Sequence, residues 1–322
     1  MLLIDSETVL ESPAADLRHA ASVVRGLFTS RRAGRALSAQ EVPMKSASTG
    51  SAFYSLPAML EERGIAGIKW TTHSKGSMPY TKPVVILNDL TDGTPLALVD
   101  GWVISAVRTA AVSLAFYDHL EELEKNAVLL CGAGHQAEWQ ALAVLARFPE
   151  LDALYIWSRD PKHAEDCRRR VLSRPGDRRL ENVVRVVRDF HDAVPKVDFV
   201  IGAASADEPY LDEGDLAHAG YVHIGMNDVS EKALLSYPVI ICDEFESAKA
   251  RSAQSLFRLW RKDPSIAGRV VLLEAYEEKI PAGARFCFDS FGLSIFDVGL
   301  ADEAYRYALA VGKGLDWPLF GR

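Results

Sequence analysis

The segment Asn126–Gln140 constrains the fold of this chain more than any other part of the sequence. A short apolar run there ends in Gly132-Ala133-Gly134, and a helical pattern that reaches Arg147 follows at once. A strand, a tight glycine turn and a helix in this order direct backbone N–H groups and a helix N-terminus at a pyrophosphate. Gly132 permits the sharp turn, and Gly134 lets a phosphate approach the backbone. The segment therefore predicts a dinucleotide-binding turn, and a plain βα turn of another α/β domain is the competing interpretation.

Residues 126 to about 292 alternate between apolar runs and helical or polar segments. The runs expected to be strands after the glycine turn are Ala153–Trp157, Val183–Val187, Asp198–Ala203, Tyr221–Ile224 and Val239–Cys242. Apolar runs separated by helices are typical of a parallel sheet that is buried on both faces. We therefore expect an α/β fold here, with a Rossmann-type doubly wound parallel sheet.

The first 125 residues mix helices and extended segments without this alternation. Helices are expected over Pro13–Ala33 and Ser105–Leu123, extended segments over Ile65–Thr72 and Lys82–Asn88, and a C-terminal helix over Gly299–Val311. The mixture indicates an α+β domain on which the C-terminal helix packs. The expected division is residues 1–125 together with 300–322 as this domain, and 126–299 as the dinucleotide-binding domain.

Composition limits the partners of the chain. With 322 residues and 48% apolar content it can bury a large core, and its formal net charge of −8 argues against a nucleic acid or an anionic membrane as partner. Its four cysteines are isolated and have no histidine at metal-ligand spacing, so we expect no metal site and a reduced, cytoplasmic protein. No apolar run reaches the ~20 residues that span a bilayer. The basic cluster of Arg168, Arg169, Arg170 and Arg174 is interpreted as a solvated helix end.

The end of the expected second strand distinguishes the two nicotinamide dinucleotides. Ser158 stands where an acid would accept the ribose hydroxyls of NAD, and Arg159 and Lys162 add positive charge nearby. A 2′-phosphate is better satisfied by these groups, so NADP(H) is favoured. NAD(H) stays possible because Asp160 could turn inward. After the fourth strand, the small residues before Ser205 indicate a second cofactor contact, and capping of a turn by Ser205 is the alternative.

Several separated motifs resemble one known family. They are Gly67-Ile68-Lys69-Trp70; Leu87-Asn88-Asp89 with Gly93-Thr94-Pro95; Ile104-Ser105-Ala106-Val107-Arg108-Thr109-Ala110-Ala111; Gly132-Ala133-Gly134-His135-Gln136-Ala137; Ile224-Gly225-Met226-Asn227-Asp228 with Lys232; and Phe288-Asp289-Ser290-Phe291-Gly292. In this order they resemble the ornithine cyclodeaminase/μ-crystallin family over nearly the whole chain. The resemblance implies a substrate-binding and dimerisation domain completed by the C-terminal helix, a Rossmann domain, a homodimer, and hydride chemistry at the α-carbon of an amino or imino acid.

The resemblance also implies roles for individual residues. Lys69 would be the catalytic-site lysine that meets the substrate carboxylate, and Arg108 would face both substrate and cofactor. Arg108 lies in an otherwise apolar helix start, so it must find an anionic partner or a surface. Asp228 would be the catalytic acid/base, with a pKa raised by a dry pocket. Phe291 and Gly292 would belong to a loop that closes over the substrate.

The full set of expected cofactor contacts combines both kinds of inference. It comprises Thr81, Arg108, Gly132, Gly134, His135, Gln136, Ser158, Arg159, Lys162, Ser205, Met226 and Lys232. For Lys232, a solvated charge on a helix surface is the alternative. The substrate site is expected to include Lys45, where the family usually has arginine, and lysine lacks the bidentate fork of arginine. This change, together with the bulky Phe291, argues against ornithine as the substrate.

Four functions are consistent with these residues. The favoured one is an NAD(P)-dependent oxidoreductase that reduces an imine or dehydrogenates an opine-type amino acid, as in a biosynthetic pathway. The second is a cyclodeaminase that releases ammonia and keeps its NAD bound, and the third is an alanine-dehydrogenase-like enzyme. The fourth is a non-catalytic protein that binds NADPH or another ligand, which would have no need of a proton-transferring Asp228.

Overall fold

The computed structural model of the protein describes residues 1–74, 76–174, 179–246 and 254–319. The chain forms two compact units: the first is Met1–Ala111 with Gly292–Arg322, and the second is Val112–Phe291. The first boundary falls inside helix α3 (Gly101–Tyr117), before the 125/126 boundary expected from the sequence, and the return to the first unit precedes the expected residue 300. A helix gives no sequence signal for such a boundary, because its hydrogen bonds continue unbroken through it.

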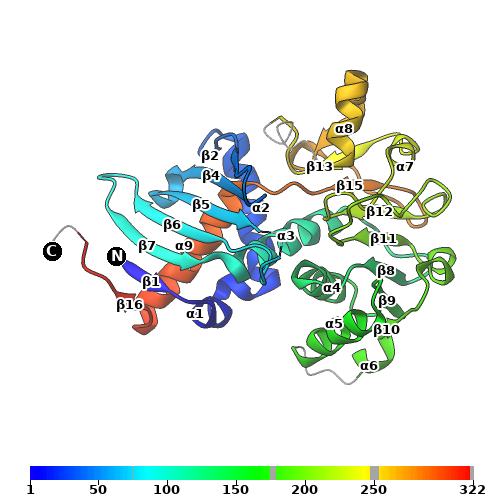
Figure 1. Ribbon diagram of the computed structural model, residues 1–322, viewed down its shortest axis with the longest axis horizontal. Helices are drawn as coiled ribbons and strands as arrows, with labels where there is room; N and C mark the ends of the chain where they lie inside the picture. Colours follow the sequence, from blue (N-terminus) through cyan, green and yellow to red (C-terminus); the bar gives the residue numbers. More distant parts are fainter. Residues whose placement is uncertain (75, 175–178, 247–253, 320–322) are drawn as a thin grey trace. The chain divides into compact units, whose positions relative to one another are not determined.

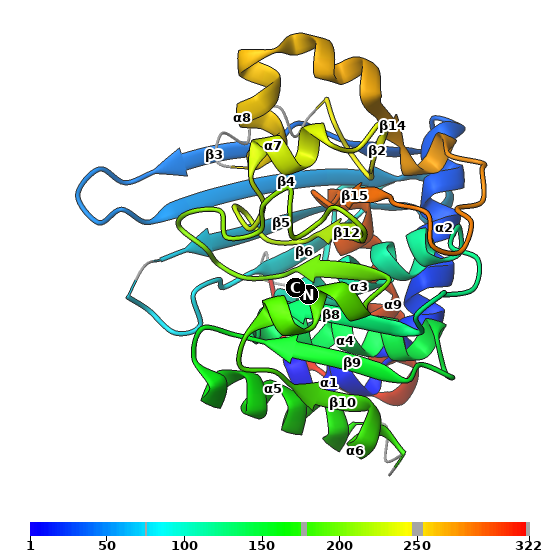
Figure 2. The same cartoon turned by 90° about the vertical axis from the view of Figure 1, so that its right-hand side faces the viewer.

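The second unit is built on a parallel sheet. Its strands are β8 (Ala127–Cys131), β9 (Ala153–Trp157), β10 (Val184–Val186), β11 (Phe199–Gly202), β12 (Gly220–His223), β13 (Ile240–Cys242), β14 (Val270–Leu272) and β15 (Cys287–Asp289). Their order in space is β10-β9-β8-β11-β12-β15-β13-β14, which Figure 2 shows from β10 low in the view to β14 high. The five strands from β8 to β12 thus stand in the order third, second, first, fourth, fifth, which is the doubly wound dinucleotide fold. The expected α/β fold class is confirmed.

The sheet is covered on both faces. Its unit contains the helices α4 (His135–Arg147), α5 (Pro161–Ser173), α6 (Leu180–Val183), α7 (Glu231–Leu235) and α8 (Ser255–Lys262). All five residues of β8 are buried, and alternate ones, Ala127, Leu129 and Cys131, share a core with Leu234 of α7 and Phe257 of α8. The order of the strands reverses between β8 and β11, and ligands of such sheets bind at the carboxyl ends of the strands at this point.

The first unit contains a mixed sheet with one face covered by helices. Its strands are β1 (Leu2–Ile4), β2 (Ala36–Ser38), β3 (Val42–Lys45), β4 (Ala52–Leu60), β5 (Ile65–His73), β6 (Val84–Asp89), β7 (Pro95–Asp100) and β16 (Leu315–Asp316), and its further helices are α1 (Ser6–Glu11), α2 (Leu17–Arg32) and α9 (Ser294–Val311). The strand order is β16-β1-β7-β6-β5-β4-β2, with β3 also paired to β4. Helix α9 runs across β4, β5 and β6 (Figure 1). Gly67 of β5 lies at this contact, where a Cβ would approach Val298 to 3.0 Å.

Strand and helix ends differ from the sequence expectation where local capping intervenes. The helix expected over Pro13–Ala33 is a 3-10 turn followed by α2, because Asp16 caps a new helix by accepting the His19 N–H at 2.7 Å. Helix α3 ends at Tyr117 rather than Leu123, and α9 begins at Ser294 rather than at residue 299. The three-residue strands β14 and β15 are not among the expected strands.

None of the helices in the described residues has the length and apolar character needed to cross a bilayer. The four cysteines are free and buried, and burial raises the pKa of each thiol. They therefore pack as small apolar side chains.

Candidate functional site

The glycine turn after β8 has the geometry of an anion site. Gly132 has a φ of 139°, and a Cβ there would lie 2.5 Å from the Ala203 carbonyl oxygen, so only glycine fits. Gly134 is the N-cap of α4 and provides no side-chain acceptor to the first turn, which begins with His135 and Gln136. Backbone N–H groups at such a helix start are available to a phosphate. The residues present fit a dinucleotide pyrophosphate.

Helix α5 braces this turn, which the sequence analysis did not anticipate. Arg170 donates from Nη2 to the Ala133 carbonyl oxygen and from Nε to Glu138, both at 2.9 Å. Arg174 donates to the other Glu138 oxygen at 2.8 Å. Glu138 is only 3% exposed and lies in the first turn of α4, where an unneutralised carboxylate would repel a phosphate. Arg170 and Arg174 are exposed, as a solvated helix end predicts, but they also pair with a buried carboxylate.

The first residue after β9 is Ser158, so no acidic side chain stands at that position. Ser158 is half-buried, and Arg159 and Lys162 are exposed. Asp160 caps α5 by accepting the Lys162 N–H at 2.9 Å, so one of its oxygens is already bound to the helix start. The other charged groups next to the strand end are two exposed cations, Arg159 and Lys162, beside the hydroxyl group of Ser158.

Asp228 occupies a tight, dry pocket at the switch point. It is fully buried, and its Oδ2 accepts the Ala204 N–H at 3.3 Å. A Cβ at Gly202 would lie 3.0 Å from the Asp228 Cβ, and a Cβ at Gly225 would overlap the carboxylate. Burial raises the pKa of Asp228 to about 6, although the positive charge of His223 and the Ala204 N–H oppose this shift. A carboxyl group with a pKa near neutrality can both give and take a proton.

The raised pKa predicts how stability depends on pH. Between about pH 4 and pH 6 the unfolded Asp228 ionises while the folded one holds its proton, so stability falls as the pH rises through this range. Asp228→Asn removes this cost. We expect the variant to be more stable than the parent protein by about 3 kcal/mol above pH 6, and equally stable below pH 4. Urea unfolding at several pH values measures the difference, and an equal gain at all pH values would contradict the titration.

The first unit contains a second group of buried charges, the Lys69–Asp297–Arg108 cluster. Lys69 Nζ lies 2.9 and 2.8 Å from the two Asp297 oxygens, and Arg108 Nε lies 3.3 Å from Oδ1. Lys69 is 3% and Arg108 9% exposed, whereas Asp297 is fully buried. Gly292 has a φ of 81°, and a Cβ there would overlap the Arg108 guanidinium. The structure thus brings together Lys69, Arg108 and Gly292, and both cations contact the same buried anion, Asp297.

The sequence model of the ornithine cyclodeaminase/mu-crystallin family matches residues 6–235. The chain belongs to this family. An N-((2S)-2-amino-2-carboxyethyl)-L-glutamate dehydrogenase of Staphylococcus aureus is 27% identical over 190 residues, which are 57% of this chain and only 55% of that relative. The ketimine reductase mu-crystallin of Rattus norvegicus is 27% identical over 245 residues, 72% of each chain. The structure of Thermococcus litoralis Delta(1)-pyrroline-2-carboxylate reductase in complex with NADH and L-proline has a TM-score of 0.87 at 20% identity, covering 98% of this chain and 100% of that one.

Lys45, which the family resemblance assigned to the substrate, lies away from the Lys69–Asp297–Arg108 cluster. It is exposed at the end of β3, where its strand-register partner on β4 is Ala52. Ala52 in turn is the register partner of His73 on β5. His73 follows Lys69 by four residues along β5, a separation of roughly 13 Å at the rise of a strand. The structure therefore does not bring Lys45 together with the other two cations.

The remaining residues assigned from the family resemblance lie in varied surroundings. Phe291 is 4% exposed and packs against Phe257 in the core of the second unit, and its contact with a substrate stays a prediction. Lys232 is 80% exposed and forms an ion pair with Glu213 at 2.6 Å, as a helix surface charge does. Met226, two residues before Asp228, and Ser205, next to Ala204, are exposed, and Thr81 is half-buried in the first unit. Their contact with a cofactor stays a prediction.

Asp297 is the functional candidate that the sequence analysis missed. The expected helix began at residue 299, which left Asp297 outside it, whereas α9 begins at Ser294. The available signal was a lone acid in the apolar run Ile295-Phe296-Asp297-Val298. A charge in an apolar run needs a counter-charge. The sequence analysis named Lys69 and Arg108 as cations of the site but did not name the acid that they contact.

Proposed function

We propose that this chain is an NAD(P)(H)-dependent oxidoreductase that acts at the α-carbon of a small amino or imino acid and reduces a C=N bond. One observation carries the proposal. Gly132 of the dinucleotide turn contacts Ala203, and the next residue, Ala204, donates its N–H to Asp228. The loop of Ala203 and Ala204 thus contacts both the glycine turn and Asp228, the carboxyl group that we assign to proton transfer.

The residues of the second unit suggest how the reaction proceeds. A bound nicotinamide dinucleotide supplies or accepts the hydride. In the reducing direction Asp228 starts protonated, which its pKa of about 6 permits near neutral pH, and gives its proton to the imine nitrogen. The carboxylate formed keeps the Ala204 N–H as its donor. In the reverse direction the same group accepts the proton from the amine.

The Lys69–Asp297–Arg108 cluster supplies a site for the substrate carboxylate. Lys69 and Arg108 are almost completely buried, and a buried cation attracts an anion more strongly than a cation in water does. Asp297 holds both cations in place before a substrate arrives. We assign Lys69 and Arg108 to this role, with Gly292 leaving space beside the guanidinium.

The relatives indicate the first substrates to test. Their names point to two imino acids, a ketimine and Delta(1)-pyrroline-2-carboxylate, and to one N-carboxyalkyl amino acid. The imino acids should be offered with NADPH and with NADH, and the N-carboxyalkyl amino acid with NADP+ and with NAD+, while the absorbance of the reduced cofactor is followed. Net turnover supports the proposal. Binding of a dinucleotide in a thermal-shift assay without turnover on any of these acids would favour a non-catalytic ligand-binding protein or a cyclodeaminase instead.

We further propose that NADP(H) is the preferred cofactor, because Ser158, Arg159 and Lys162 surround the end of β9 and Asp160 caps α5. Ser158→Asp should lower the ratio of kcat/KM for NADPH over NADH by at least about tenfold, since a carboxylate repels the 2′-phosphate and accepts the ribose hydroxyls. Ser173→Asp at the far end of α5, roughly 20 Å along the helix, is the matched control. An unchanged ratio in Ser158→Asp would rule out this interpretation of β9.

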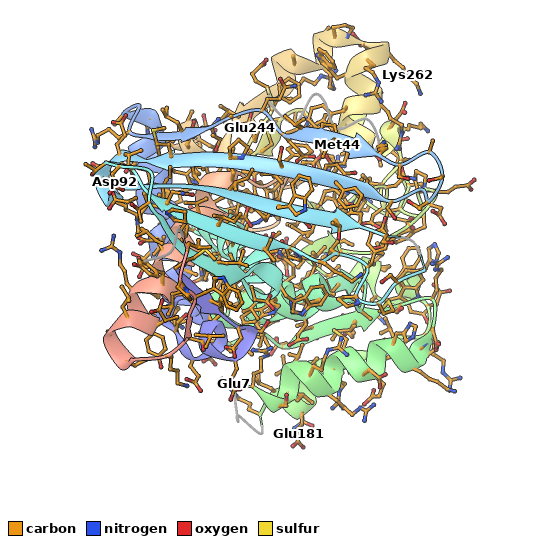
Figure 3. The ribbon with its side chains drawn as sticks, turned by 60° about the vertical axis from the view of Figure 1, so that its left-hand side comes forward. Glu7, Met44, Asp92, Glu181, Glu244 and Lys262 are labelled. Atoms are coloured by element: carbon orange, nitrogen blue, oxygen red, sulfur yellow. The ribbon has the colours of Figure 1, made fainter. Side chains whose placement is uncertain are left out.

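We also propose a cytoplasmic homodimer. Exposed apolar side chains lie on β3 and at the C-terminal end of the first unit, among them Val42, Met44, Leu315 and Trp317. Met44 is labelled on its strand in Figure 3. Such side chains are typical of a surface that a second copy covers. Light scattering during size-exclusion chromatography measures the mass, and a monomer at all concentrations would contradict the proposal.

A further inference from the structure

A buried histidine–aspartate pair lies at the carboxyl ends of two neighbouring strands. His223 ends β12 and Asp289 ends β15, and the two residues are direct partners in the parallel ladder. Both side chains are fully buried, with His223 Nδ1 3.1 Å from Asp289 Oδ1. Apart from this ion pair, neither side chain has a hydrogen-bond partner within the described part of the chain. Nothing in the fold requires charged residues at this point of an apolar sheet.

The surroundings favour the charged form of this histidine. Burial by itself lowers the pKa of His223, but Asp289 and then Asp228 more than reverse the effect, so the pKa is raised. Arg258 of α8 opposes it weakly, and the Tyr221 ring stacks beside the imidazole at 5.6 Å between centroids. The nearby Asp289 carboxyl group therefore favours the imidazolium form of His223.

The same imidazolium lies beside Asp228. His223 pairs with Gly202 in the ladder between β11 and β12, and Gly202 is the glycine whose missing Cβ leaves space for Asp228. The Tyr221 hydroxyl group reaches the same space, where a Cβ on Gly202 would approach it to 2.4 Å. Two buried carboxyl groups, Asp228 and Asp289, thus share one positive charge.

We propose that His223, kept protonated by Asp289, is the positioning residue that sets the proton affinity of Asp228. The idea rests on the proposed function, in which Asp228 transfers a proton. When Asp228 has given its proton away, it carries a negative charge in a dry pocket, and His223 is the cation that compensates it. Without His223 the ionised Asp228 would lose this counter-charge, so the group would hold its proton to higher pH.

The test measures the titration of Asp228 directly in the full-length protein. The infrared band of its protonated carboxyl group is identified as the band lost in Asp228→Asn. In His223→Gln we expect the midpoint of this band to rise by about one to three pH units. His218→Gln, at an exposed histidine of the same unit, should leave the midpoint unchanged. A midpoint in His223→Gln that stays the same or falls would overturn the proposal.

A second variant protects the test against misfolding. His223→Gln leaves Asp289 buried without its partner, whereas His223→Gln with Asp289→Asn contains no unpaired charge at this place. The midpoint of Asp228 should rise in the double variant too, and an unchanged midpoint there would overturn the proposal. A purely structural role would reduce stability without moving the midpoint.

The infrared titration does not need turnover, so it separates this proposal from the proposed function. If the protein reduces imines, Asp228 must be protonated, and the alkaline limb of kcat/KM should move upward with the infrared midpoint. If no imino acid is turned over, the proposed function fails, while the infrared midpoint still decides the role of His223.

Discussion

Asp228→Asn is expected to lower kcat for imine reduction by about 10²- to 10⁴-fold while dinucleotide binding stays unchanged. The amide keeps the shape of the side chain and can still accept the Ala204 N–H, but it cannot give a proton to the substrate. Stopped-flow absorbance of the nicotinamide measures hydride transfer, and fluorescence titration measures cofactor affinity.

The matched control is Asp152→Asn, at an exposed aspartate of the same unit, which should retain full activity. Retained hydride transfer in Asp228→Asn would remove this residue from the acid/base role. Loss of cofactor binding together with activity would instead indicate that the loop after β12 shapes the dinucleotide site.

Asp297→Asn is expected to lower the free energy of unfolding by about 3–5 kcal/mol, because it leaves two buried cations without their anion. Lys69 and Arg108 are almost completely buried, so water cannot replace the lost carboxylate. Lys69→Met should cost less, since Asp297 still has Arg108 as a partner. Urea denaturation of each variant gives the comparison.

Asp316→Asn provides the control, because this side chain is 91% exposed and its removal should have no measurable effect. A loss for Asp297→Asn no larger than that of the control would show that Lys69 and Arg108 do not depend on it.

Periodicity and turn chemistry made much of the second unit predictable. The strand expected over Ala153–Trp157 is β9, and the helix after the glycine turn ends at Arg147 as expected. These features depend on neighbouring residues, whose apolar pattern and glycines act locally. The short strands β14 and β15 were hidden, because only their place in the sheet makes them strands.

The sequence by itself determined the glycine turn and the position of Asp228 in a loop after an apolar strand, because each depends on residues that are consecutive in the chain. Only the tertiary structure decided which charges meet. Asp297 is 228 residues from Lys69 along the chain, and His223 meets Asp289 because β12 and β15 lie side by side. A charged residue in an apolar stretch of sequence indicates that a partner is needed. Which residue becomes the partner depends on how the strands and helices pack, and no local pattern encodes that packing.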